Sequence, residues 1–109
     1  RQAPPVAAHA VPFADDASNQ LWNQATHAKA SRTPTGLDEA ASAFAELSRR
    51  HPRSPAPRVG LAETYLLMRE FAGLSDEAAF RRARDAAEAA LRLDADNPDA
   101  MRALGFILF

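Results

Sequence analysis

The chain has 109 residues, enough for a single domain, and 47% of them are hydrophobic while 25% are charged. Thirteen basic and 14 acidic residues give a net charge of −1, so no overall field would draw the chain to nucleic acid or to an anionic membrane. Cysteine is absent, which excludes disulfides, thiolate metal sites and cysteine nucleophiles. The 26 alanines favour closely packed helices and predict an all-α fold.

The N-terminal part of the chain differs in composition from the rest. Residues 1–14 contain three of the eight prolines and show no helical period, so we expect a flexible Pro/Ala-rich tether. A helical domain is predicted over residues 15–109. Its first helix starts near Asp15 and Asp16, because these oxygen-bearing side chains precede a helical pattern of apolar residues.

The later helices have recognisable start signals. In Thr33-Pro34, Ser54-Pro55 and Asn97-Pro98, an N-cap side chain that accepts a free backbone N–H is followed by a proline. Ser75 is followed by two acids, which favour the positive end of a helix dipole. These signals predict five helices, over residues 16–31, 34–50, 56–71, 76–93 and 98–109.

Two stretches of the chain share one spacing, Ala40-x3-Phe44-x7-Pro52 and Ala83-x3-Ala87-x7-Ala95. This is the pattern of the second helix of a tetratricopeptide repeat. The same register places Leu61-Ala62-x2-Tyr65 and Leu104-Gly105-x2-Leu108 where the next first helix of the repeat carries Leu-Gly-x2-Tyr. The chain therefore resembles a tetratricopeptide-repeat domain, and the resemblance implies antiparallel helix pairs stacked into a short right-handed solenoid. Phe44 and Tyr65 are then expected to interlock successive helices.

The second repeat is predicted to be longer than usual. Its landmark residues lie 43 positions apart, whereas the standard period is about 34 residues. We expect the additional residues within 69–76, where Gly73 allows a turn and where Phe71 and Leu74 cover the longer loop.

The resemblance also implies a binding groove, because the first helix of each pair lines the concave wall of such arrays. Matched residue by residue, the register gives Val59, Glu63, Leu66, Asp99, Arg102, Phe106 and Phe109, with Trp22, Lys29 and Arg32 as candidates in the first repeat. The phase of the first repeat is open: counting back 34 residues puts Ala28 at its small-residue position, whereas a turn three residues longer at residues 32–34 puts Ala25 there. The binding candidates are Trp22, Lys29, Arg32, Glu63, Arg102 and Phe106. Trp22 has an alternative interpretation as a core residue beside Leu21, and packing roles are equally open for Val59 and Leu66.

No constellation of catalytic or metal-binding residues is apparent. His9, His27 and His51 have no spacing that would place two of them on one metal, and His51 is interpreted as a helix-end residue that interacts with the helix dipole. The four glycines are isolated, so phosphate-binding loops are not predicted. We expect a protein that is not an enzyme and needs neither cofactor nor metal.

The densest basic patch is Arg81-Arg82-x-Arg84, and acids interrupt it. Three i,i+4 pairs, Glu77/Arg81, Arg84/Glu88 and Glu88/Arg92, predict a solvated, salt-bridged helix face. Nucleic-acid binding by this fragment is therefore not expected. No apolar run is long enough for a membrane segment.

A narrower resemblance rests on the strings RTPTGLDEAASAF, VGLAETYLLM and LDADNPDAMRALGFILF. Residues 21–109 resemble the C-terminal repeat region of membrane-anchored winged-helix transcriptional regulators of the CadC/ToxR type. The resemblance implies a sensor domain on the periplasmic side of a membrane, which binds a protein, peptide or small-molecule signal. The alternative is a cytoplasmic scaffold or adaptor that binds peptide segments of partner proteins. In either case we interpret the chain as a fragment of a longer protein.

The C-terminal helix has more apolar surface than one face can hide. Leu104, Phe106, Ile107, Leu108 and Phe109 place five large apolar side chains within six residues. We expect a homodimer through this helix, because a second copy would cover the surface.

Overall fold

The computed structural model describes residues 13–108, and this part of the chain contains helices and no strand. The helices are α2 (Asp16–Ser31), α3 (Pro34–Arg50), α4 (Ala56–Phe71), α5 (Asp76–Leu93) and α6 (Pro98–Leu108). The predicted all-α fold and the predicted helix bounds are confirmed, except that Phe109 lies outside the described residues. Residues 1–12 of the predicted tether lie outside them as well.

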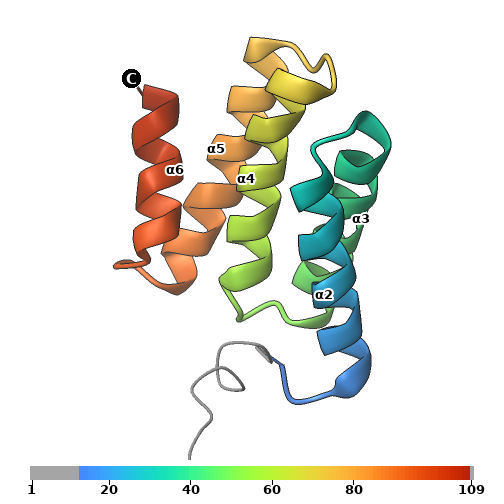
Figure 1. Ribbon diagram of the computed structural model, residues 1–109. Coiled ribbons are helices and arrows are strands. Elements are labelled where there is room, and N and C mark those ends of the chain that lie inside the picture. The colour runs from blue at the N-terminus through green and yellow to red at the C-terminus, as the bar shows by residue number, and fades with distance from the viewer. Residues whose placement is uncertain (1–12, 109) are drawn as a thin grey trace, which may run out of the picture.

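The helices form two layers, with α2, α4 and α6 in one layer and α3 and α5 in the other. Consecutive helices run in opposite directions, and α4 lies between the α2–α3 pair and α6 (Figure 1). Helix α4 contacts all four other helices, whereas α3 and α5 make no contact with each other. One side of α4 therefore lies toward α2 and α6. Along its other side, a furrow runs between α3 and α5.

Most helices begin at the predicted caps. The capping oxygens of Asp15, Thr33, Ser75 and Asn97 accept hydrogen bonds from the backbone N–H three residues later, at distances of 2.9, 3.0, 3.2 and 2.9 Å. The prediction for Ser54 is wrong: α4 begins after Pro55, which has no capping side chain. The Ser54 backbone N–H instead donates to the carbonyl of His51, so the chain turns there before the helix starts.

The structure differs from the predicted tether at Phe13, which is buried. Asn19 holds it through both backbone groups: Phe13 N–H donates to Asn19 Oδ1 at 3.0 Å, and Asn19 Nδ2 donates to Phe13 O at 2.7 Å. The ring stacks on His51 with centroids 4.3 Å apart. The N-terminus of α2 is thus fixed to the C-terminus of α3.

Ser18 joins this junction and also stabilises the Asp15 cap. Its hydroxyl lies 2.7 Å from His51 Nε2. Hydrogen bonds from Ser18, first from its side chain and then from its backbone, hold the pKa of the Asp15 carboxyl below its usual range. The stability that this cap contributes is therefore present above the ordinary aspartate pKa and is lost as the pH falls through the lowered value.

The core combines a few large side chains, of which Phe44 is the largest that is fully buried, with many alanines. Phe44 is fully buried, and a methyl group placed on Gly60 of α4 would lie 2.6 Å from Phe44 Cε1. On the other side of α4, the buried face of α5 consists of Ala79, Ala83, Ala86, Ala87 and Ala90. Tyr65 is half-buried and packs against this alanine cluster. Small side chains let the helices approach closely, as the composition predicts.

Two expectations for the second helix pair are wrong. Among the described residues, none of the three predicted i,i+4 pairs on α5 lies within ion-pair distance. Asp76 of α5 instead pairs with Arg69 of α4, with Nη1 and Oδ1 3.5 Å apart. The expected longer loop is absent, because only residues 72–75 join α4 to α5; Gly73 turns the chain there with a φ of 73° as predicted. Phe71 is 40% exposed and Leu74 is half-buried.

We expect Phe44→Ala to destabilise the fold by roughly 3–5 kcal/mol, because it removes a fully buried ring and leaves a cavity against Gly60. Phe71→Ala is the matched control, and its exposed ring should contribute less than about 1 kcal/mol. Urea unfolding followed by circular dichroism measures both. Similar losses for the two variants would contradict the packing described for Phe44.

Candidate functional site

A groove with three cavities runs along the side of the molecule formed by α2, α4 and α6. The first cavity, of about 230 Å³, lies between Trp22 of α2, Gly60 of α4 and Asp99 of α6. The second, of about 340 Å³, lies further along α4 and reaches Phe106 of α6. The third, of about 190 Å³, lies between α4 and α6 at Arg102. All six sequence-predicted binding residues line at least one of these cavities.

An ion pair crosses the groove where the first two cavities meet. Lys29 Nζ donates to Glu63 Oε1 at 2.6 Å, and their side chains are 25% and 36% exposed. Both residues line both cavities. The pair therefore joins α2 to α4 and separates two neighbouring positions at which a ligand side chain could be held.

Trp22 belongs to the core and to the groove at once. Its ring meets Phe13 and Phe44 edge to face, with centroids 5.9 and 5.4 Å away. It remains half-buried and lines the first cavity together with Phe44. Both interpretations of Trp22 therefore describe part of its environment. Its packing holds the indole in one orientation at the cavity wall.

Phe106 forms the α6 wall of the second and third cavities. Its ring meets Phe80 edge to face at 6.5 Å, and the guanidinium of Arg69 lies 5.8 Å from its centroid. The same guanidinium lies 5.1 Å from Phe80. These contacts position Phe106, yet 54% of its surface remains exposed, so it offers an apolar face to the groove.

The ends of the groove carry further charges. Arg102 pairs with Asp99 within α6, with Nη1 and Oδ1 2.6 Å apart. Arg32 caps α2 with a left-handed backbone, φ 52°, and lines the second cavity together with Glu70. A non-glycine residue in this conformation is strained by about 1–2 kcal/mol. In total, three basic and three acidic side chains border the groove, so its charge is balanced.

Sequence reasoning missed several groove residues. Thr26, Leu67, Glu70 and Asn97 also line the cavities. Thr26 lies four positions from Trp22, and Glu70 lies four positions from Leu66, a spacing that places side chains on one helix face. That signal could have found them. Asn97 is the cap of α6, and only the approach of the α5–α6 turn to α2 brings it to the cavity. Val59 and Leu66 line the groove as the register predicts.

Features of other site classes were sought in the same residues. Within residues 13–108, no group of three or more histidine, cysteine or acidic residues is arranged to hold a metal ion. Among the described helices, none has the length and apolar character needed to cross a membrane. His27 is exposed on α2, and His9 lies outside the described residues.

Comparison with protein-family models, curated proteins and solved structures finds no match to this chain.

We expect the Lys29–Glu63 pair to contribute less than about 1 kcal/mol to stability, because both side chains are partly exposed and screened by solvent. A double-mutant cycle with Lys29→Ala and Glu63→Ala, measured by urea unfolding, gives the coupling energy. A coupling well above that value would assign the pair mainly to folding and remove Lys29 from the binding candidates.

Proposed function

We propose that this chain is a tetratricopeptide-type binding domain that holds a segment of a partner protein in the groove between α2, α4 and α6. The observation that carries the proposal is a spacing. Lys29 and Glu63 are 34 residues apart and in contact, as equivalent positions of neighbouring repeats would be. Phe106 follows Glu63 by 43 residues, the predicted length of the longer repeat, and lines the same cavity.

A second set of residues supports the same repeat. Trp22, Ala56 and Asp99 follow one another at the same two spacings and together line the first cavity. Stacked helix pairs bring equivalent side chains to one wall, because each pair adds the same rotation and translation. Two sets of residues thus support one register, and the antiparallel order of the helices agrees with it.

The chemistry of the groove suits an extended peptide. The Lys29–Glu63 pair separates an aromatic cavity at Trp22 from an apolar one at Leu66, Leu67 and Phe106. An extended chain places successive side chains on one face about 6–7 Å apart, so it can put one side chain into each cavity. Its backbone would cross the ion pair, whose charged atoms can hydrogen-bond to peptide N–H and C=O groups.

This binding role is non-catalytic and fits two cellular settings. The resemblance to winged-helix regulators favours a sensor domain of a transcriptional regulator on the periplasmic side of a membrane. The alternative is a cytoplasmic adaptor that recruits proteins by their peptide segments. The coding sequence upstream of residue 1 distinguishes them, because the first setting requires a winged-helix domain and a membrane helix there.

Intrinsic fluorescence offers a direct test of the groove. Trp22 is the single tryptophan of the chain and lines the first cavity, so a bound peptide should change its emission. We expect peptides selected from a random display library to give a saturable change. Phe106→Ser should weaken their binding about tenfold, the loss expected when roughly 1.4 kcal/mol of apolar contact is removed.

Phe71→Ser is the matched control for that experiment. It makes the same change on an exposed phenylalanine of α4 that does not line the groove cavities, so peptide affinity should stay within about twofold. Equal losses for both variants, or selected peptides that leave Trp22 emission unchanged, would contradict binding in this groove. Saturable quenching by small molecules alone would identify a small-molecule sensor instead.

We also propose that α6 mediates a homodimer. Met101 and Leu108 are 55% and 67% exposed and lie seven residues apart, on one face of α6. A methyl group on Gly105 between them would meet no atom within 4 Å, so another helix could approach closely there. Leu104 and Ile107, by contrast, pack against the α4–α5 cluster.

Sedimentation velocity at increasing protein concentration tests the dimer. We expect Met101→Asp with Leu108→Asp to shift the equilibrium to monomer, because two carboxylates would be buried at the interface. Leu93→Asp, on an exposed leucine of α5, should leave the dimer intact. A parent chain that stays monomeric at high micromolar concentration would contradict the proposal.

A further inference from the structure

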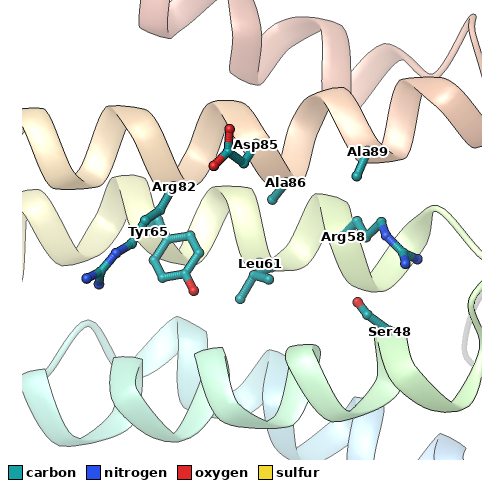
Figure 2. A pocket seen from close by; sticks show the side chains of 8 residues that line it. All are labelled: Ser48, Arg58, Leu61, Tyr65, Arg82, Asp85, Ala86 and Ala89. Atoms are coloured by element: carbon teal, nitrogen blue, oxygen red, sulfur yellow. The ribbon is translucent and has the colours of Figure 1, made fainter.

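A second cleft lies on the side of α4 that faces away from the groove. Its floor is α4 and its walls are α3 and α5, which contact α4 and not each other. Figure 2 shows Leu61 and Tyr65 at its centre, with Arg58 at one end and Arg82 at the other. Its volume is about 310 Å³. This size is within the range of known ligand sites.

The middle of this cleft is apolar. Leu61 and the Tyr65 ring come from α4, and Ala86 and Ala89 come from α5 (Figure 2). Leu61 and Tyr65 are only half-buried, although they pack against the buried alanine cluster. The cleft thus leaves apolar surface open to a partner.

The two ends of the cleft are basic. Arg58 Nη1 donates to the carbonyl of Pro52 at 3.3 Å, which holds that guanidinium at the α3–α4 turn. The Arg82 guanidinium lies 5.9 Å from the centre of the Tyr65 ring. Among the described residues neither arginine forms an ion pair, and Asp85 is the one carboxylate that lines the cleft. The cleft is therefore lined by two positive charges and one negative charge.

We propose that this cleft binds an acidic amphipathic helix of a partner protein. Arg58 and Tyr65 are seven residues apart on α4, so the Cα positions of Arg58 and of the tyrosine beside Arg82 are separated by about 10 Å along the helix. Carboxylates at positions i and i+7 of a helix span the same length, with apolar side chains at i+3 and i+4 between them. A furrow between two helices accommodates the ridge of a third. This inference does not rest on the function proposed for the opposite groove.

Each feature of such a partner has a counterpart in the cleft. Its leucines would cover Leu61 and the Tyr65 ring, and its carboxylates would form charge-assisted hydrogen bonds with Arg58 and Arg82. The Tyr65 hydroxyl makes no hydrogen bond with the residues that the structure describes, and it points toward α3 in Figure 2. It therefore remains able to donate a hydrogen bond to an incoming carboxylate.

The test uses a fluorescein-labelled, alanine-rich helical peptide with Glu at i and i+7 and Leu at i+3 and i+4, followed by anisotropy. We expect saturable binding that weakens about tenfold in Arg82→Gln and more in Arg58→Gln with Arg82→Gln. Replacing both peptide Glu by Gln should weaken binding as much as the double arginine variant does, because it removes the same two charge pairs. Arg81→Gln is the matched control, because Arg81 is exposed on the same helix outside the cleft and should leave affinity unchanged. Circular dichroism melts confirm that the variants fold.

Three outcomes would overturn the proposal. The first is a peptide that does not bind at low salt, and the second is one that binds equally well to the Arg82→Gln and Arg81→Gln variants. In the third, a single-stranded oligonucleotide or vesicles of anionic lipid bind in an Arg82-dependent manner while the peptide does not. That result would assign the cleft to a different class of anionic partner.

Discussion

The contact between the Phe44 ring and the backbone of Gly60 sets the spacing on which the remaining structure depends. Any side chain larger than hydrogen at Gly60 would overlap the ring, so α3 and α4 pack at a distance that this pair determines. Trp22 packs on the other side of Phe44, and Phe13 and His51 continue the aromatic chain to the start of α2. Packing against α3 thus determines where α2 lies beside α4. Because Phe44 and Gly60 also line the first groove cavity, the core and the candidate site share one wall.

The Lys29–Glu63 pair has a different kind of importance. Partly exposed ion pairs add little to stability, since the Coulomb energy is screened and two long side chains must be ordered. Its effect is positional, because it holds two charges across a groove whose neighbouring walls are apolar. In the proposed binding mode, a ligand backbone would meet positioned donors and acceptors there instead of mobile side chains. Fixed polar groups reduce the ordering that binding requires, which is how a shallow groove gains selectivity.

Features that depend on neighbouring residues could be predicted from the sequence. Features that depend on contacts between distant elements could not. Thr33, Ser75 and Asn97 act within one helical turn, so the caps and the helix bounds could be predicted from local chemistry. Ser54 satisfies the same local rule, but the turn after His51 engages it first. The α5 arginines also have acids at favourable spacing, yet Arg82 lies beside Tyr65 of α4. The groove candidates were found because a repeat makes distant residues equivalent. The cleft at Arg58 has no such signal, because Ser48 of α3 and Arg82 of α5 do not occupy equivalent positions of the repeat.

Helix α4 contacts all four other helices and still has two open faces, one in the groove and one in the cleft, which differ in charge. Several small or buried side chains of α4, among them Gly60 and Ala62, lie at its helix contacts, and longer side chains line its two open faces. Toward α2 and α6 these include Glu63 and Glu70, which the basic residues Lys29, Arg32 and Arg102 of the same groove balance. Toward the furrow they include Arg58, which joins Arg82 and faces a single carboxylate. If both proposals hold, the balanced groove would select its partner by shape and by the order of its side chains, whereas the cleft, with its excess of positive charge, would attract an acidic partner at longer range. One helix would then present two surfaces for different partners, and neither surface would need a residue from the other.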